Sequence, residues 1–536
     1  MAGFGRCRAA DGLDQRLRVK PIHRRVAAAK SVSTLESALS VAPTPDVALS
    51  VDETGSELKR GAVFNTIAML ASNLRGVFTF LVARMLGPAA LGTFSVAWAT
   101  TDIISKIGVL GLDNAITTFI ARAQAVGDRA RSRALFRLAV ALAVALSAAI
   151  AVVSVVVLRL LGDRLGLQRE MVAALAITVC ALPGVALYRI STSVSRGMKV
   201  MKHDIFSRGM TEPIATTLAF LVAFIIGLKR FAPELAAIVG TAASGVVAVA
   251  LASSLFPRKP LAGGNLSLRS ETRALLNYAA PISAYQLLNA FIFRLDIVML
   301  GWFIGRAPGV TLVTVGVYGA VVDLAGGLRK VNQAFNPIFA PVVAGITATG
   351  DQERAAATYA RLAQWMLWIL LPLVAVMMLA GGTILLIFGP AFRQGGTWLG
   401  IVAVACATNA FVALGETVIM VQRPRLNLLN SSITCVVAIG ANLWLIPRFG
   451  VTGAAFGILL PYVVQGILRY LVLRLAFRWP NPWNNTSPPV IAAIIAIVPA
   501  LICRVFLDGI VGQLTAAAVF LAVFGIGWLY HLRSRR

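Results

Sequence analysis

Histidine, cysteine and acidic residues are scarce in this chain. Its 536 residues include three histidines and five cysteines, and Asp and Glu total 22 against 49 Lys and Arg. His23, His203 and His531 lie in tails or a connecting loop, so neither a His-based metal site nor a Ser/His/Asp triad can form within the apolar part. The cysteines fall at unrelated spacings without a CxxC pair and are interpreted as small core residues. The sequence therefore predicts no catalytic residue, metal or cofactor.

Charged residues of either sign are also few. They make up 13% of the chain, whereas 58% is hydrophobic, which is far from the balance of soluble domains. Apolar runs of roughly 20 residues recur, and each is long enough to cross a hydrocarbon core of about 30 Å as a helix. These runs do not alternate between apolar and polar residues, which excludes a transmembrane β-barrel. The chain is predicted to be an all-α, polytopic membrane protein.

Fourteen membrane spans are predicted from these runs. Their approximate bounds are 61–83, 90–112, 134–158, 171–190, 207–228, 233–256, 275–302, 310–332, 361–388, 396–421, 427–447, 451–474, 488–507 and 510–530. Residues 1–60 are polar and basic, and we expect them to form a mobile cytoplasmic tail without a cleavable signal peptide.

The net charge of +27 is distributed unevenly across the predicted membrane. Lys and Arg concentrate in the N-terminal tail and in the connections on its side, which places both termini in the cytoplasm. The basic connections also favour anionic membrane lipids as partners. Aromatic residues interleaved with a soluble basic surface are lacking, so nucleic acid is not an expected partner.

The first twelve spans contain a weak internal repeat. FLVARMLG (80–87) matches RLDIVMLG (294–301), and further matched segments keep the same order. Each copy has an even number of spans, so both copies face the same way and are expected to enclose a central cavity. The predicted parts are an N-lobe (61–256), a C-lobe (257–478), and a linker with two appended spans (479–536).

Polar residues form stripes on several predicted spans. A helix advances about 100° per residue, which places Asp102 and Lys106 on one face of the second span. Ionisable groups at membrane depth cost at least ~2.5 kcal/mol each, so they tend to face a bundle interior or water. The stripes on spans one, two, seven, eight and ten supply the candidate site residues Arg75, Asp102, Lys106, Gln286, Asn289, Arg294, Asp296, Asp323, Lys330 and Glu416.

These charges have two interpretations. Some can be structural ion pairs that lock helices together, above all Asp102 with Lys106, and Glu416 can be an isolated acid buried in its neutral form. Alternatively, the basic groups line a cavity for an anionic substrate, because guanidinium groups bind phosphate oxygens with two hydrogen bonds. Arg294 lies about 160° from Asp296 around the helix, so these two residues cannot simply pair.

Three segments resemble a known family. LVARMLGPAALGTFSVA (81–97), GLDNAITTFIARAQAVGD (111–128) and VGVYGAV (315–321) are similar to the oligosaccharide flippases of the Wzx type. These flippases belong to the superfamily of multidrug, oligosaccharidyl-lipid and polysaccharide exporters. The likeness covers about residues 61–480. Fourteen spans resemble the lipid II flippases, in which two added helices border a groove for the lipid tail, whereas many oligosaccharide flippases have twelve.

The resemblance implies a substrate and residue roles. The substrate would be a polyprenyl diphosphate-linked oligosaccharide, turned between the leaflets of the bacterial cytoplasmic membrane by alternating access of two six-helix lobes. Other polysaccharide assembly proteins would be partners. The implied diphosphate- or sugar-binding residues are Arg75, Lys106, Arg294 and Lys330, and the implied ion-coupling residues are Asp296, Asp323 and Glu416. Gln286 and Asn289 are further candidates for substrate binding, and Asp102 is a further candidate for ion coupling.

Two rival functions stay open. A drug/cation antiporter of the same superfamily would need a cavity dominated by acids. A membrane enzyme of glycan assembly would need catalytic groups on an outer loop, where Asp163 and Arg164 are the best candidates. The outer loops are short, which favours a transporter over an enzyme.

Overall fold

The computed structural model describes residues 51–534 except 163, 165, 257–267, 333–351 and 482, and of 51–73, 268, 421, 422, 424 and 484 it describes the backbone alone. Residues 1–50, most of the predicted tail, lie outside the described part. Within that part, all regular structure is helical. Among the described residues, twelve helical stretches are long and apolar enough to cross a membrane, and two of them are bent pairs of spans. The predicted polytopic helical fold with fourteen spans is confirmed.

The first repeat consists of the helices up to residue 253. Its first two spans are the arms of α2, and helix α2 begins ahead of the predicted first span. The elements are α2 (Val51–Val109), α3 (Leu112–Ala125), α4 (Arg129–Leu161), α5 (Arg169–Val179), α6 (Leu182–Gly197), α7 (Lys202–Asp204), the π-helix η1 (Ile205–Thr211), α8 (Glu212–Ile225), η2 (Lys229–Phe231) and α9 (Ala232–Ser253).

The second repeat and the appended helices occupy the rest of the described chain, from residue 268 to residue 534. The elements are α10 (Leu268–Trp302), α11 (Leu312–Ala325), η3 (Gly326–Leu328), α13 (Gln352–Leu379), α14 (Gly381–Leu385), η4 (Pro390–Gly395), α15 (Gly396–Gln422), α16 (Pro424–Leu471), the π-helix η5 (Val472–Ala476), α17 (Trp483–Phe506) and α18 (Gly509–Ser534).

Glycine and proline divide the two bent helices. In α2 the backbone leaves the helix at Gly87, whose φ of 84° is accessible to glycine at little cost, and Pro88 then opens the second arm. Helix α16 bends in the same way at Gly450, with a φ of 56°. Each bend turns the chain back through the bundle. One continuous helical stretch therefore provides two spans.

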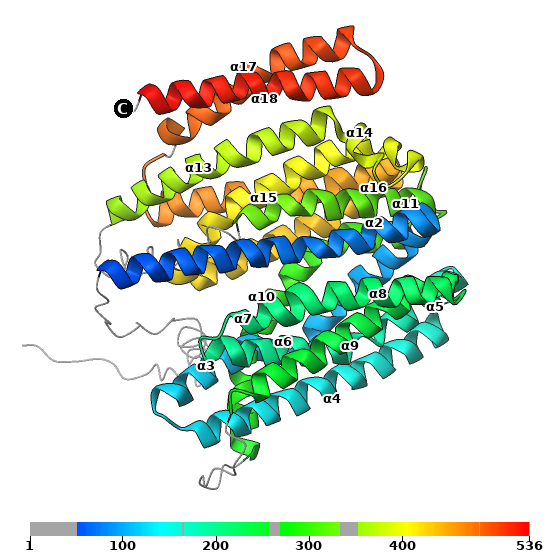
Figure 1. Cartoon of the computed structure of the whole chain (residues 1–536), viewed down its shortest axis with the longest axis vertical. Helices are drawn as coiled ribbons and strands as arrows, with labels where there is room; N and C mark the ends of the chain where they lie inside the picture. The colour runs from blue at the N-terminus through cyan, green and yellow to red at the C-terminus, as the bar shows by residue number, and fades with distance from the viewer. Residues whose placement is uncertain are drawn as a thin grey trace, which may run out of the picture. The chain divides into compact units, whose positions relative to one another are not determined.

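The connections predicted on the outer side meet at one end of the bundle, which we call the outer end. Arg306, between α10 and α11, donates to the carbonyl of Gly166, between α4 and α5, over 2.9 Å. Gly450, at the bend of α16, packs on Pro308. In Figure 1 this end, with α14, lies to the right, and the C terminus lies to the left. Both repeats thus run in the same direction across the bundle.

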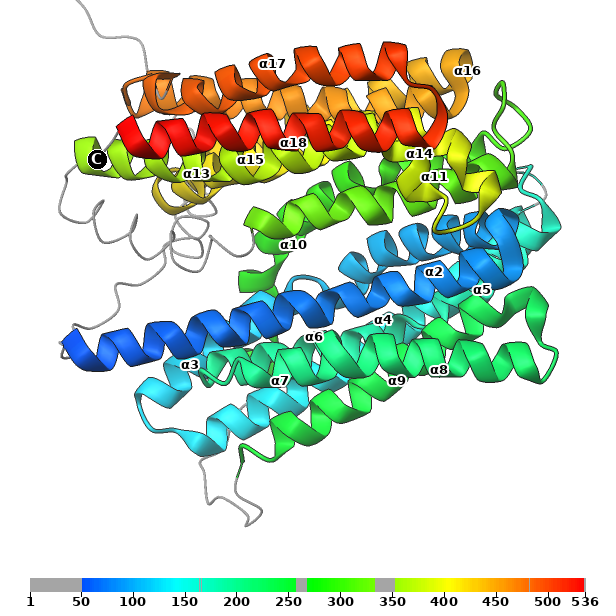
Figure 2. The same cartoon turned by 45° about the horizontal axis from the view of Figure 1, so that its top comes forward.

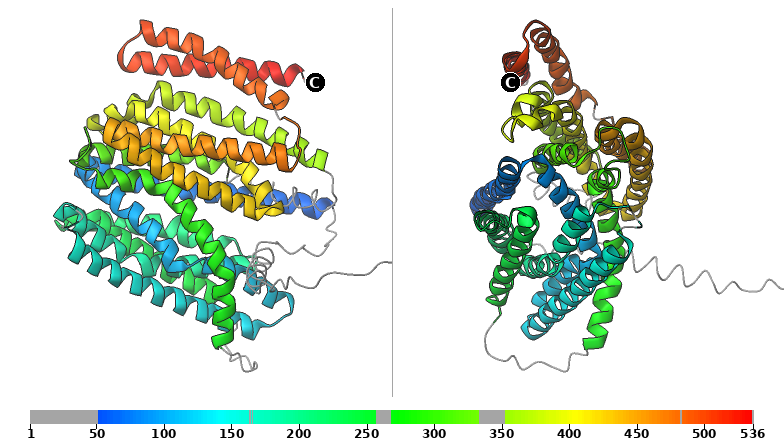
Figure 3. Two further views of the ribbon diagram at one scale, coloured as in Figure 1. Left: turned by 180° about the vertical axis from the view of Figure 1, so that it is seen from behind. Right: turned by 90° about the vertical axis from the view of Figure 1, so that its right-hand side faces the viewer.

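Helix α10 lies between two groups of helices. Figure 2 shows α3, α4, α6, α8 and α9 on one side of α10 and α13, α15, α17 and α18 on the other. The view from behind in Figure 3 shows the same order. Helix α10 packs against α2, against α3 of the first group, and against α16. The exact lobe boundaries stay a prediction.

The two repeats touch through glycines near the outer end. Helix α11 packs on the second arm of α2, where Gly92 faces Gly316. A side-chain carbon on Gly92 would overlap the carbonyl oxygen of Leu312, and one on Gly316 would overlap that of Pro88. Membrane helices approach this closely where small residues leave room. The contact closes the outer end between the repeats.

The last two helices are an added layer. Helices α17 and α18 pair with each other and dock on α13, where Trp368 and Leu379 meet Ala500 and Phe520 in one apolar cluster. Figure 1 shows the pair at the edge of the bundle, beyond α13. They have no counterpart in the repeat, as predicted from the sequence.

Candidate functional site

Polar side chains from α2, α6, α7, α8, α10 and the π-helix η1 converge on one cavity. Its volume is about 240 Å³, and we call it the arginine cavity. The second arm of α2 contributes Asp102, α8 contributes Glu212, and α10 contributes Arg294. The remaining charged lining residues are Arg75, Arg189, Asp204 and Arg208. Four arginines thus face three carboxylates.

Asp102 joins two arginines from different helices. Its Oδ2 lies 3.3 Å from Nε of Arg294 on α10, and its Oδ1 lies 3.3 Å from Nη2 of Arg189 on α6. No ion pair is seen between Asp102 and Lys106 within the described residues; Lys106 is half-buried one turn further along. Each carboxylate oxygen therefore holds a different guanidinium, and each guanidinium keeps further N–H donors for a ligand.

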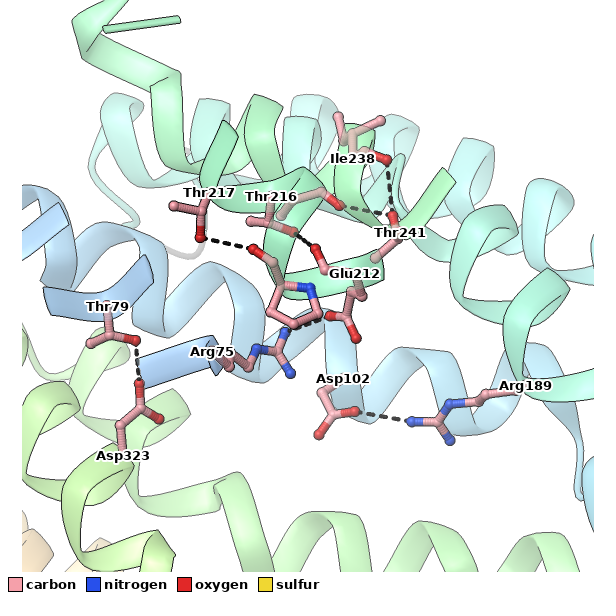
Figure 4. A network of polar contacts seen from close by, with 12 residues as sticks. Arg75, Thr79, Asp102, Arg189, Glu212, Thr216, Thr217, Ile238, Thr241 and Asp323 are labelled. Atoms are coloured by element: carbon pink, nitrogen blue, oxygen red, sulfur yellow. Dashed lines mark hydrogen bonds and ion pairs between the residues drawn. The ribbon is translucent and has the colours of Figure 1, made fainter. Parts of the chain in front are cut away.

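Arg75 forms the second ion pair of the cavity. Its Nη2 lies 3.2 Å from Oε1 of Glu212, and its guanidinium stacks 4.6 Å from the ring centre of Trp98. Figure 4 shows this guanidinium beside the Glu212 carboxylate, with Asp102 close by on the second arm of α2. Although Arg75 lies within an apolar span, 47% of its side chain is exposed. Arg75 therefore lines the cavity with a side chain that is only partly covered by protein.

Asp323 contacts the first arm of α2 at Thr79, one turn from Arg75. Its Oδ2 accepts a hydrogen bond of 2.9 Å from Thr79, which connects α11 to the first arm of α2 (Figure 4). Asp323 is exposed, and Lys330, beyond η3, is half-buried. Neither residue lines the arginine cavity.

Asp296 belongs to a separate, buried group. It is 2% exposed, and its Oδ2 accepts a hydrogen bond of 2.8 Å from the hydroxyl of Tyr318 on α11. Its Oδ1 is buried and has no hydrogen-bond partner in the described part of the chain. Nearby, Arg329 stacks 4.2 Å from the ring centre of Phe293 and donates to Tyr462 over 3.2 Å. As the helix geometry predicts, Asp296 and Arg294 point into different surroundings.

Glu416 is not the isolated acid that its sequence surroundings indicate. Its Oε2 lies 2.7 Å from Nη2 of Arg469 on the second arm of α16, and Arg469 is 2% exposed. The hydroxyl of Tyr285 donates to the other oxygen of Glu416, and Asn427 donates to that hydroxyl over 3.2 Å. The prediction of an isolated acid is wrong because these partners lie on α10 and α16, and the sequence around Glu416 does not contain them.

Gln286 and Asn289 lie on α10 outside the cavity lining. Gln286 donates to Oδ1 of Asp113, at the start of α3, over 3.2 Å. Asn289 donates to the backbone carbonyl of Tyr285 over 3.1 Å. Their predicted face is thus occupied by contacts that fix α10 against α3 and by its own backbone.

Sequence reasoning missed several residues of these groups. The polar stripes of spans one, two, seven, eight and ten supplied the predicted site residues. Spans four and five, which contain Arg189, Arg208 and Glu212, supplied none. One signal was present, because the Lys202–Ile225 stretch is the least apolar of the candidate spans in the described residues. Charges in such a span need polar surroundings.

The same fold occurs in solved transporter structures. "Lipid II flippase MurJ, inward closed conformation" aligns with a TM-score of 0.69 at 12% identity, covering 88% of this chain and 99% of that one. An inward-facing MATE-family multidrug transporter of the MOP superfamily aligns with a TM-score of 0.63 at 16% identity, covering 78% of this chain and 98% of that one. A mutant of the Vibrio cholerae MATE transporter VcmN aligns with a TM-score of 0.57 at 17% identity, covering 80% of this chain and 99% of that one. No curated protein matches the sequence significantly.

The sequence itself matches a protein family. The pattern of the family described as "Polysaccharide biosynthesis protein" matches residues 58–343, more than half of the chain. This range includes the two arms of α2, the helices around the arginine cavity, and α10 and α11. The chain, which has the fold of the MOP-superfamily transporters, belongs to the polysaccharide biosynthesis protein family.

Proposed function

We propose that this protein is a flippase for a polyprenyl diphosphate-linked oligosaccharide. It receives the lipid-linked glycan from the inner leaflet of the bacterial cytoplasmic membrane and releases it to the outer leaflet. The transport proceeds by alternating access of the two six-helix repeats. Membrane lipids and other proteins of polysaccharide assembly are its partners.

The observation that carries the proposal is the arginine cavity. Arg75, Arg189 and Arg294 enter it from three helices, and their carboxylate partners leave further donor groups unused. A diphosphate carries several oxygens that arginine binds in pairs, and such charge-assisted bonds are stronger than neutral ones. In a membrane interior these bonds gain further from the low dielectric. The cavity suits the diphosphate, and the glycan would lie beyond it.

We propose that ion coupling resides in the acids outside the arginine cavity. Asp296 is the first candidate, because one of its buried oxygens lacks a hydrogen-bond partner within the described residues and can take up a cation. Glu416 and Asp323 are further candidates, with Arg469 and Thr79 as their contacts. In this proposal Asp102 releases or retakes Arg294 as the diphosphate arrives and leaves.

Two rival functions predict other sites. A drug/cation antiporter would favour a cavity in which acids outnumber bases, whereas the lining here has more arginines. An enzyme of glycan assembly would need Arg164 or Asp163 at the outer end; Arg164 is exposed, and Asp163 lies outside the described residues. The flippase proposal expects no loss of activity from Arg164→Ala.

The proposal is tested in cells that make the glycan. In Arg294→Ala, the lipid-linked glycan should accumulate on the inner leaflet and stay inaccessible to an impermeant lectin added outside. Arg448→Ala is the matched control, because Arg448 is exposed at the outer end, away from the cavity. Normal appearance of the glycan outside in Arg294→Ala would contradict the proposal.

A further inference from the structure

A second polar pocket lies at the outer end, between the C-terminal helix pair and the second repeat. Its volume is about 420 Å³, and we call it the outer pocket. Arg393 and Thr397 come from η4 and α15, Arg504 from the end of α17, and Gln513 from the first turns of α18. The pocket shares no lining residue with the arginine cavity. No role is assigned to it by the proposed function.

The outer pocket carries uncompensated positive charge. Arg393 and Arg504 are exposed, and neither side chain has a hydrogen-bond or ion-pair partner among the residues that the structure describes. No described Asp or Glu lines the pocket. Two like charges sharing one pocket repel each other unless an anion lies between them. The pocket therefore favours a ligand with at least one negative group.

The deeper wall of the outer pocket is apolar. Thr397 lies at the outer start of α15, and Ile401 and Val404 follow one and two turns further into the bundle. Leu459 of α16 and Met378 of α13 complete this wall, and Met378 is 52% exposed. Positive charge at the outer end thus continues into an apolar surface further along the bundle. This order matches an anionic lipid, whose head group lies outside its chains.

The walls of the outer pocket are fixed by specific contacts. Gln513 Oε1 accepts hydrogen bonds from the backbone N–H and the hydroxyl of Thr383, over 2.9 and 2.7 Å, which fastens α18 to α14. A side-chain carbon on Gly381 would lie 2.7 Å from the carbonyl oxygen of Gly396, so α14 and α15 pack backbone to backbone. A pocket held in this way loses little conformational freedom when a ligand binds.

We propose that the outer pocket binds the phosphate head group of a lipid in the outer leaflet. Arg393 of η4 and Arg504 of α17 donate to the phosphate oxygens, and the lipid chain lies along Ile401 and Val404. Both a phospholipid and a polyprenyl diphosphate present this chemistry. The inference does not rest on the proposed function, since binding here can be measured without transport.

Binding to the purified full-length protein in detergent tests the inference. The probes are phosphatidylglycerol, polyprenyl diphosphate and inorganic pyrophosphate, measured by native mass spectrometry and titration. The double variant Arg393→Gln/Arg504→Gln should weaken phosphatidylglycerol binding by about tenfold or more, the range of one lost charged hydrogen bond. The matched control Arg448→Gln, exposed at the same end, should bind as wild type.

The three probes distinguish the sources of the phosphate. Binding of phosphatidylglycerol identifies a phospholipid, and selective loss of polyprenyl diphosphate binding in the double variant identifies the carrier lipid. Because polyprenyl diphosphate is also expected in the arginine cavity, its measurement is repeated in an Arg294→Ala background. Pyrophosphate should bind more weakly than either lipid, because it lacks the chain.

Two results would overturn the inference. One is that the double variant binds both lipids as tightly as wild type. The other is that photoreactive analogues of both lipids label wild-type protein only outside residues 378–404 and 504–513. Glycan export is measured separately. If the double variant loses lipid binding but exports glycan normally, the flippase proposal stands. If the wild type binds lipid in the outer pocket but exports no glycan, the inference about the outer pocket stands.

Discussion

Asp102 and Arg294 form an ion pair between the two repeats, with Oδ2 of Asp102 on α2 lying 3.3 Å from Nε of Arg294 on α10. The residues are 192 positions apart in the chain. Both side chains are 25% exposed, so the pair is open to the arginine cavity. An ion pair in this position can open when a competing anion arrives.

The first prediction concerns the carboxylate of this pair. Asp102→Asn removes the negative charge that holds Arg189 and Arg294 together, so the guanidinium groups become free for a diphosphate. We expect polyprenyl diphosphate to bind several-fold more tightly and to be exported more slowly, because release is impeded. Titration and initial export rates measure the two effects. Asp204→Asn is the control, because Oδ2 of Asp204 lies a longer 3.8 Å from Nη2 of Arg208. This variant should change the binding affinity and the export rate less.

The second prediction concerns the buried pair of Glu416 and Arg469. Arg469 is almost fully buried, so Glu416→Ala leaves its charge without the carboxylate. Removing one partner of a buried pair costs about 3–5 kcal/mol of stability. In thermal unfolding of the purified protein, the unfolding temperature of Glu416→Ala should lie well below that of the wild type. Unchanged stability would contradict a structural role, and the test is independent of transport.

A matched replacement separates coupling from stability at the same site. Glu416→Gln keeps an oxygen that can accept from Arg469 and Tyr285, so it should unfold closer to wild type. If Glu416 couples an ion, this variant should lose the ion dependence of transport while staying folded. Equal ion dependence in wild type and Glu416→Gln would assign the residue to structure alone.

The third prediction concerns Asp296 and Tyr318. Tyr318→Phe removes the only hydrogen bond that a described side chain donates to this buried carboxylate, which costs about 1–3 kcal/mol. We expect lower thermal stability together with an altered ion concentration for half-maximal transport. Tyr530→Phe, at an exposed position on α18, is the control. A stability loss without any change in ion dependence would argue against a coupling role for Asp296.

The fourth prediction concerns the contact between the repeats at the outer end. Gly316→Ala places a carbon where it overlaps the Pro88 carbonyl, so the outer end cannot close as observed. Hydrogen exchange at residues 88–96 and 312–319 should become faster, and transport should fall. Gly440→Ala is the control, because a carbon there meets no atom within 4 Å. Slow exchange in Gly316→Ala would show that the contact tolerates the extra carbon.

The sequence predicts the spans well because each span is a local property. All fourteen predicted spans coincide with helices, including the two that share α2, because twenty apolar residues suffice to specify a helix in a membrane. The start of α2 at Val51 differs from the prediction, since a helix can continue into water beyond its apolar run.

The polar contacts are less predictable because they join distant segments. Helix geometry correctly separates Arg294 from Asp296, but the partners Arg189 and Arg469 lie on helices that local patterns do not connect with them. The i,i+4 spacing of Asp102 and Lys106 suggests a pair, yet two arginines on neighbouring helices occupy both oxygens of Asp102. Only the packing of α6 and α10 against α2 brings these groups together.

The most direct test of the account is the rate of translocation in proteoliposomes that contain only this protein. The substrates are a diphosphate-linked glycolipid and a glycolipid with the same sugars and chain but no phosphate. The account predicts that only the diphosphate form moves faster than in protein-free vesicles, and that Arg294→Ala abolishes this gain. Equal translocation of both glycolipids, or full activity of Arg294→Ala, would contradict it.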